Sequence, residues 1–165
     1  IINEVNEGET IVFTLDKQKY KYQYPNSILK PCLFEYIYFS RLDSIVNKIS
    51  IYNCRYKLGE LLGINMLEEK ENIDFIIPTP ETSRVYAYGM SKKMNIPIQE
   101  CIIKNRYINR TFIIENKKKI SKDIKRKFSV IREIVKNKSV ILLDDSVVRG
   151  NTSRNIIKLL SLIHI

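Results

Sequence analysis

Two adjacent carboxylates follow a short apolar run near the end of the sequence. Residues 140–143 are Val-Ile-Leu-Leu, Asp144 and Asp145 come directly after them, and a turn with Gly150 leads into the amide and hydroxyl side chains of 151–153. Small residues let backbone N–H groups converge, and a helix N-terminus adds positive potential, so this turn suits a phosphate monoester. The carboxylates have the wrong sign for phosphate and instead fit ribose hydroxyls or a hard divalent cation. The segment therefore predicts a site for a phosphorylated ligand.

Other classes of site also place acids at the end of a strand. A Walker phosphate-binding loop is excluded, because no lysine follows Gly150. In phospho-accepting receiver domains the acidic pair comes early and the acceptor lies on a later strand, which disfavours that class here. A purely structural acidic turn stays open as an alternative.

The positive charge of the chain is concentrated in one segment. Residues 104–127 hold ten Lys or Arg against two acids, which is +8 of the net +10. An excess of this size indicates anionic partners, either nucleic acid or small phosphorylated substrates. For residues 117–127 we favour a solvated helix face, because apolar residues recur at helical spacing over 120–134. Residues 104–111 lack a strong period, and a nucleic-acid arm or a loop that closes over a polyanion both stay open.

The strands and helices that must position these residues alternate along the sequence. We expect strands at residues 11–15, 73–77, 96–103 and 139–143, and helices at 55–69, 83–94, 121–135 and 152–163. A strand, the Pro78-Thr79-Pro80 turn, a helix and a second strand form a unit that requires a parallel sheet with a right-handed crossover. The predicted fold class is therefore α/β, an open doubly wound parallel sheet, in which ligands bind at the carboxyl ends of the strands.

Composition sets the broad class of protein. The chain has 165 residues, of which 44% are hydrophobic and 28% charged, enough for a packed core in roughly one domain. No apolar stretch approaches the ~20 residues of a membrane span. The sequence shows no basic–apolar–small-residue leader pattern, so we expect no secretory signal. Cys32, Cys54 and Cys101 form no CxxC pair, in keeping with reduced thiols. Because the first residue is Ile1, we expect the chain to be a piece of a longer protein.

The segment around the paired acids resembles the 5-phosphoribosyl-1-pyrophosphate (PRPP) motif of type I phosphoribosyltransferases. Residues 144–150, Asp-Asp-Ser-Val-Val-Arg-Gly, are more specific than that general motif and resemble the amidophosphoribosyltransferase family. Four other segments resemble parts of that family in the right order: the last glutaminase strand (5–13), the start of the transferase domain (31–44), the pyrophosphate-loop strand (76–83) and the flexible loop (104–113). The resemblance covers most of residues 31–161.

This resemblance implies a site for PRPP and Mg²⁺ and assigns a role to individual residues. Asp144 and Asp145 would hold the ribose hydroxyls, and Thr82 would join them around the metal. The pyrophosphate would be bound by Glu81, Thr82, Ser83 and Arg84. The 5-phosphate would be bound by Ser146, Val148, Arg149, Gly150, Asn151, Thr152 and Ser153. The catalytic residues, on the flexible loop, would be Lys104, Arg106, Tyr107, Arg110 and Thr111.

The same resemblance implies a reaction and its partners. The full enzyme would transfer ammonia, released from glutamine, to C1 of PRPP in the first step of de novo purine biosynthesis. Residues 1–30 would be the tail end of a glutaminase domain with a linker, and residues 31–165 an incomplete phosphoribosyltransferase domain that alone supports at most the ammonia-dependent half-reaction. We expect a cytoplasmic homo-oligomer that binds neither nucleic acid nor membrane. The alternative function is a PRPP-binding transcriptional regulator on the same fold.

Overall fold

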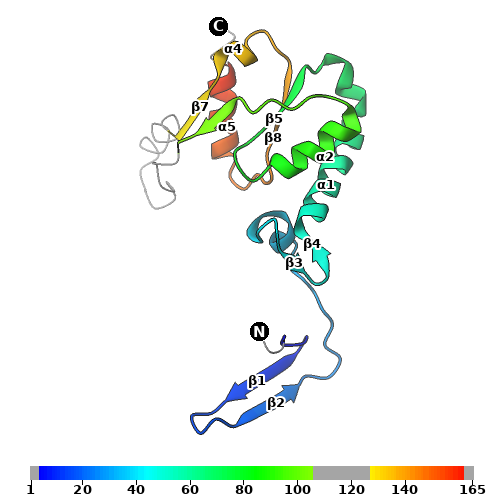
Figure 1. Ribbon diagram of the computed structural model, residues 1–165, viewed down its shortest axis with the longest axis vertical. Coiled ribbons are helices and arrows are strands. Elements are labelled where there is room, and N and C mark those ends of the chain that lie inside the picture. Colours follow the sequence, from blue (N-terminus) through cyan, green and yellow to red (C-terminus); the bar gives the residue numbers. More distant parts are fainter. Residues whose placement is uncertain (1–3, 106–126, 162–165) are drawn as a thin grey trace. The chain divides into compact units, whose positions relative to one another are not determined.

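The computed structural model describes residues 4–105 and 127–161 and divides the chain into two compact units. The smaller unit, Ile1–Leu33, contains a hairpin of β1 (Glu9–Phe13) and β2 (Lys19–Gln23), drawn in blue in Figure 1. The two strands pair antiparallel, with Glu9 opposite Gln23. Large apolar side chains of this hairpin are exposed.

The larger unit, Phe34–Ile165, contains the remaining elements. In chain order these are η1 (Glu35–Phe39), β3 (Ile45–Val46), β4 (Ile49–Ser50), α1 (Ile51–Asn65), η2 (Leu67–Asn72), β5 (Phe75–Pro78), α2 (Arg84–Met94), β6 (Ile102–Lys104), β7 (Phe128–Val130), α4 (Arg132–Val135), β8 (Val140–Leu143) and α5 (Asn151–Ser161). Helix α1 begins where the Ser50 side chain accepts a hydrogen bond from the Asn53 N–H. Helix α2 ends at Asn95, whose backbone is left-handed. Among the described residues, no helix is long and apolar enough to cross a membrane.

The strands that carry the site form a parallel pair. Strand β5 pairs with β8 from Phe75↔Val140 to Pro78↔Leu143. A parallel bridge between Ile76 and Ile98 adds a neighbour on the other side of β5. The predicted α/β fold with parallel strands is therefore confirmed.

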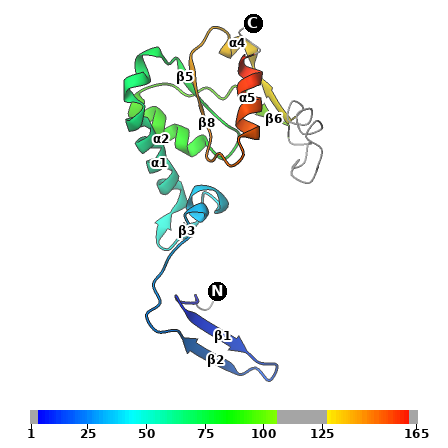
Figure 2. The same ribbon diagram turned by 180° about the vertical axis from the view of Figure 1, so that it is seen from behind.

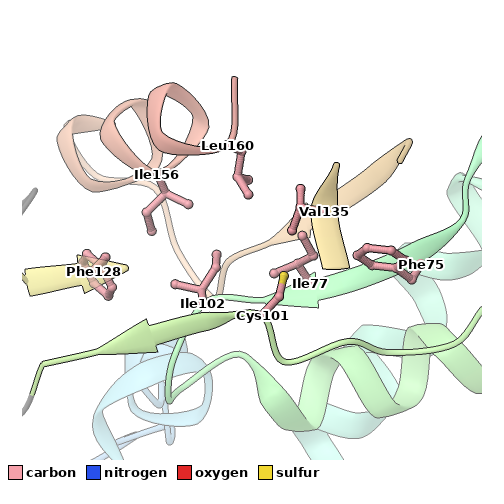
Figure 3. Close-up of a cluster of buried hydrophobic side chains, with 8 residues drawn as sticks. All are labelled: Phe75, Ile77, Cys101, Ile102, Phe128, Val135, Ile156 and Leu160. Atoms are coloured by element: carbon pink, nitrogen blue, oxygen red, sulfur yellow. The ribbon is translucent and has the colours of Figure 1, made fainter. Parts of the chain in front are cut away.

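Two apolar clusters lie on opposite faces of this pair. One contains Ile77 from β5 together with Ile156 and Leu160 from α5, and Figure 3 shows it between the strands and that helix. The other contains Ile76 and Ile141 with side chains of α2. Helix α5 thus covers one face and α2 the other, as the two opposite views of Figures 1 and 2 show. The helices on both faces fix the strand ends on which the site depends.

The expected helix over residues 121–135 is wrong at residues 128–130. Residues 128–130 form β7, which pairs antiparallel with β6 so that Phe128 lies opposite Lys104, and only Arg132–Val135 is helical. Residues 121–126 lie outside the described ranges. Phe128 is buried in the cluster beneath α5, so strand pairing and burial outweigh the helical spacing of its neighbours.

The expected strand over residues 96–103 is divided into two pieces. The Ile76 N–H donates to the Pro97 carbonyl, and the Gln99 N–H donates to the Ile76 carbonyl. Further on, Ile102–Lys104 pairs with β7 instead of β5. One apolar segment therefore serves two different neighbours.

Candidate functional site

The two segments predicted to bind the ligand leave the sheet side by side. Because β5 and β8 are parallel, their carboxyl ends lie at the same edge. The Thr79 N–H donates to the Leu143 carbonyl over 2.8 Å, which ties the two strand ends together. The Ser83 hydroxyl donates to the Thr79 carbonyl over 2.6 Å and closes the turn that leads into α2. The fold thus brings the start of the predicted pyrophosphate turn next to the paired acids.

The two acids have different surroundings. One oxygen of Asp144 accepts from the Asp145 N–H at 3.1 Å, and the other accepts from the Ser153 hydroxyl of α5 at 3.3 Å. One oxygen of Asp145 accepts from the Ser146 hydroxyl, whereas its Oδ2 is buried and has no hydrogen-bond partner among the described residues. Asp145 also acts electrostatically on Tyr86 of α2, where burial is the main cause that raises the tyrosine pKa to about 12. Asp144 is therefore associated with α5 and Asp145 with α2.

The electrostatics of the pair favour a cation. Burial raises the pKa of Asp144, and the negative charge of Asp145 raises it further, against the two hydrogen bonds that lower it. Carboxylate oxygens are hard ligands, and Asp145 Oδ2, which has no partner in the described part of the chain, can still accept a ligand. The described residues include no group of three or more His, Cys, Asp or Glu that could hold a metal. The residues fit Mg²⁺, which usually takes one or two carboxylates and completes its shell with water and substrate oxygens.

Replacing Asp144 by asparagine tests this electrostatic description. The folded-state pKa lies above the ordinary value of 3.8, so the contribution of Asp144 to the unfolding free energy falls as the pH rises through the raised pKa. We expect Asp144→Asn to raise the melting temperature at neutral pH, with a difference that fades once the wild-type carboxyl is protonated in both states. Thermal unfolding of both proteins from about pH 3 to pH 7 measures this. A difference that grows toward acidic pH would contradict it.

The loop after the acids has the geometry of an anion-binding turn. Gly150 has a positive φ of 67°, a conformation that favours glycine, and its carbonyl accepts from the Arg154 N–H at 2.9 Å. Helix α5 begins at the next residue, so its first N–H groups have no acceptor within the helix and are available to a ligand. Val147 and Val148 are exposed, which leaves the turn open to solvent.

The other predicted site residues divide into two groups. Arg84 lies at the start of α2, where its guanidinium forms a 2.8 Å ion pair with Glu100. Lys104 lies at the end of β6 and is partly buried. The remaining predicted catalytic residues lie outside the described ranges: Arg106, Tyr107, Arg110 and Thr111.

Sequence reasoning assigned no role to three residues that bear on this region through a hydrogen bond, an ion pair or charge. Thr79 joins the two strand ends, Tyr86 interacts with Asp145, and Glu100 pairs with Arg84. A hydroxyl between two prolines at the end of an apolar strand is a signal that points to Thr79. Tyr86 and Glu100 have no such signal, because only tertiary packing brings them near the predicted site residues.

Parallel strands covered by helices on both faces, with acids at one strand end, agree with the type I phosphoribosyltransferase fold, and the likeness to solved structures supports this class. The glutamine PRPP amidotransferase of B. subtilis, solved in complex with ADP and GMP, matches 99% of this chain and 35% of its own, with a TM-score of 0.74 and 32% identity. A second solved structure, described as the allosteric regulatory enzyme of purine biosynthesis, matches with a TM-score of 0.74.

Curated relatives give a more specific similarity. Amidophosphoribosyltransferases of Escherichia coli, Haemophilus influenzae and Saccharomyces cerevisiae are 40%, 37% and 35% identical over 161, 163 and 162 residues. These matches cover 94–96% of this chain and 32% of each relative. No family model matches. Over the matched residues the chain is similar to amidophosphoribosyltransferases, and it spans about a third of the length of these relatives.

Proposed function

We propose that this chain binds PRPP and forms the transferase part of an enzyme that makes 5-phosphoribosylamine and pyrophosphate in de novo purine biosynthesis. The observation that carries the proposal is the hydrogen bond from Thr79 to Leu143, which sets the pyrophosphate turn beside the paired acids. A ligand with pyrophosphate on C1, hydroxyls on the ribose and a 5-phosphate matches this order of groups. The matched relatives are named as enzymes, and this favours catalysis over the regulator alternative.

Three segments of the chain each bind a different part of the substrate. Asp144 and Asp145 accept hydrogen bonds from the ribose hydroxyls. The turn of Glu81, Thr82, Ser83 and Arg84 binds pyrophosphate mainly through backbone N–H groups and hydroxyls, because the Glu81 carboxylate has the wrong sign. The 5-phosphate is bound by the N–H groups and polar side chains of Ser146, Val148, Arg149, Gly150, Asn151, Thr152 and Ser153.

The reaction exchanges one bond at C1 for another. Ammonia donates its electron pair to C1, the C1–O bond breaks, and the electron pair of that bond leaves with pyrophosphate. The new C1 ammonium group then loses one proton to solvent and becomes the amine. Positive charge develops on the ribose, and the carboxylates of Asp144 and Asp145 stabilise it. Thr82, Asp144 and Asp145 would hold Mg²⁺, which supplies Lewis-acid neutralisation of the pyrophosphate charge when bound. Lys104 with Arg106 and Arg110 adds positive charge toward the leaving group, and Tyr107 and Thr111 complete the proposed catalytic set.

The smaller unit has a different proposed origin. We assign residues 1–30 to the end of a glutaminase domain with its linker. Glutamine hydrolysis in that domain would supply the ammonia. Phe13, Leu15 and Tyr24 are 71%, 105% and 77% exposed in the hairpin unit, and an isolated two-stranded hairpin is marginal in water. Free Cys32, Cys54 and Cys101 agree with a reducing cytoplasm. The whole enzyme is proposed to be a homo-oligomer.

Binding and turnover together test the proposed function. Calorimetry with PRPP and Mg²⁺ should give binding, and PRPP with an ammonium salt should give pyrophosphate release that requires both reactants. Absence of PRPP binding would refute the site. Tight PRPP binding without ammonia-dependent turnover in the whole protein would favour the regulator.

Replacing Arg110 by alanine separates a catalytic charge from simple attraction. If Arg110 acts mainly on the departing pyrophosphate, Arg110→Ala should lower kcat with ammonia by about 10- to 100-fold, while PRPP affinity changes less. Initial rates against PRPP concentration, together with calorimetric affinity, measure the two effects. An effect confined to KM would show that Arg110 attracts substrate without acting in the transition state.

A further inference from the structure

Thr79 connects both halves of the proposed site through its backbone. Its N–H donates to the Leu143 carbonyl, just before the paired acids, and its carbonyl accepts from the Ser83 hydroxyl in the pyrophosphate turn. Thr79 is only 5% exposed, and its Oγ1 has no hydrogen-bond partner among the described residues. A buried hydroxyl without a partner is costly, and such a group at a binding site calls for a function.

Strand geometry places this hydroxyl on the same face as Asp144. Pro78 is opposite Leu143, so continuing the parallel register sets Thr79 opposite Asp144. Side chains alternate along a strand, and Thr79 follows two residues after Ile77, whose side chain lies in the cluster under α5 (Figure 3). Asp144 likewise follows two residues after Leu142, which packs against the same cluster. Continuing this alternation one residue past the end of each strand sets the two side chains as cross-strand neighbours on the α5 face.

The side-chain hydrogen bond from Ser153 to Asp144 is weak. The Ser153 hydroxyl lies 3.3 Å from Asp144 Oδ2, well beyond the usual O–H···O distance of about 2.7–2.8 Å. Ser153 is also one of the residues assigned to the 5-phosphate, and while it donates to Asp144 its proton is not available to a phosphate oxygen. A carboxylate accepts several hydrogen bonds, so a second donor on this face can replace the first.

We propose that Thr79 is a positioning residue: when a ribose phosphate binds, its hydroxyl replaces that of Ser153 as the hydrogen-bond donor to Asp144. Ser153 then donates to the 5-phosphate, while the Thr79 hydroxyl donates to Asp144 and orients its carboxylate toward the ribose hydroxyls. This exchange gives the buried Thr79 donor an acceptor in the bound state. The inference rests on the proposed function, because it deepens the role of Asp144 in PRPP binding.

Replacing Thr79 by valine, which is nearly the same size, tests the exchange in the protein. The expected signature is a pair of opposite effects. The melting temperature of the ligand-free protein should stay the same or rise, because a buried donor without a partner is removed. The Kd for ribose 5-phosphate and for PRPP should rise about tenfold, as for loss of a hydrogen bond to a charged group. The Kd for pyrophosphate measured without Mg²⁺ should stay unchanged, since pyrophosphate without the metal does not engage Asp144.

Thr79→Ser is the matched control, because it keeps the hydroxyl, and we expect its ribose 5-phosphate affinity within about twofold of wild type. Unchanged ribose 5-phosphate affinity in Thr79→Val would overturn the inference, as would an equal loss in Thr79→Ser or a loss for pyrophosphate alone. If Thr79→Val does not fold, Thr79→Cys replaces it, and we expect the same changes in Kd with a smaller size. Wild-type protein that binds neither PRPP nor ribose 5-phosphate would instead overturn the proposed function.

Discussion

Replacing Asp144 and Asp145 together by asparagine is expected to lower PRPP affinity at least about 100-fold, since hydrogen bonds to charged groups contribute about 1.5–3 kcal/mol each. Asparagine keeps the shape of both side chains but removes both charges. It therefore loses the strong acceptors for the ribose hydroxyls and the carboxylates that suit a divalent cation. Calorimetric titration of PRPP in the presence of Mg²⁺ measures the loss.

A matched pair of charge changes serves as the control. Asp16→Asn with Asp43→Asn removes the same two charges from exposed positions outside the proposed site. This control should bind PRPP like wild type, because the ion pair of Asp43 with Arg41 is exposed and contributes little to stability. The Asp144/Asp145 variant should melt no lower than wild type, since burial disfavours the charged form of Asp144, as its raised pKa indicates. A folded double variant that keeps PRPP affinity would exclude the paired acids from the site.

A methyl group at Gly59 or Gly89 is expected to destabilise the larger unit by about 3 kcal/mol, at the upper end for overpacked cores. The two helices α1 and α2 approach each other at these glycines. A Cβ on Gly59 would lie 2.0 Å from the Tyr86 carbonyl oxygen, and a Cβ on Gly89 would lie 2.0 Å from the Tyr56 carbonyl oxygen. Backbone atoms cannot rotate away, so the helices must separate. Denaturant unfolding of Gly59→Ala and Gly89→Ala measures the loss.

Gly63 offers a control on the same helix. A Cβ there would lie 3.2 Å from the nearest atoms, the Lys93 Cβ and the Met90 carbonyl oxygen, so a small shift suffices. Alanine also gains about 1 kcal/mol of helix propensity over glycine. We expect Gly63→Ala to stay within about 1 kcal/mol of wild type. Because α2 begins at the end of the pyrophosphate turn, Gly59→Ala and Gly89→Ala should also weaken pyrophosphate binding. If both variants were as stable as wild type, α1 and α2 would pack less closely than described.

The sequence by itself determined the features that depend on local order. An apolar run, two acids, a turn with Gly150 and a polar helix start are adjacent in the chain, and α5 does begin one residue after that glycine. The alternation of apolar segments and helices likewise predicted parallel strands, since a strand, a crossover helix and a strand leave few other arrangements. Family resemblance followed from the same contiguous motifs, and the relatives confirm it.

Tertiary structure decided the features that depend on which segments become neighbours. Phe128 lies in a strand despite helical spacing, because β6 supplies backbone partners and the cluster beneath α5 buries the ring. The different surroundings of Asp144 and Asp145 follow from the packing of α5 and α2 on opposite faces of the sheet. Thr79 gains its importance only when β5 and β8 lie side by side. Long-range pairing sets these properties, and a one-dimensional pattern of residue types does not encode which surfaces will meet.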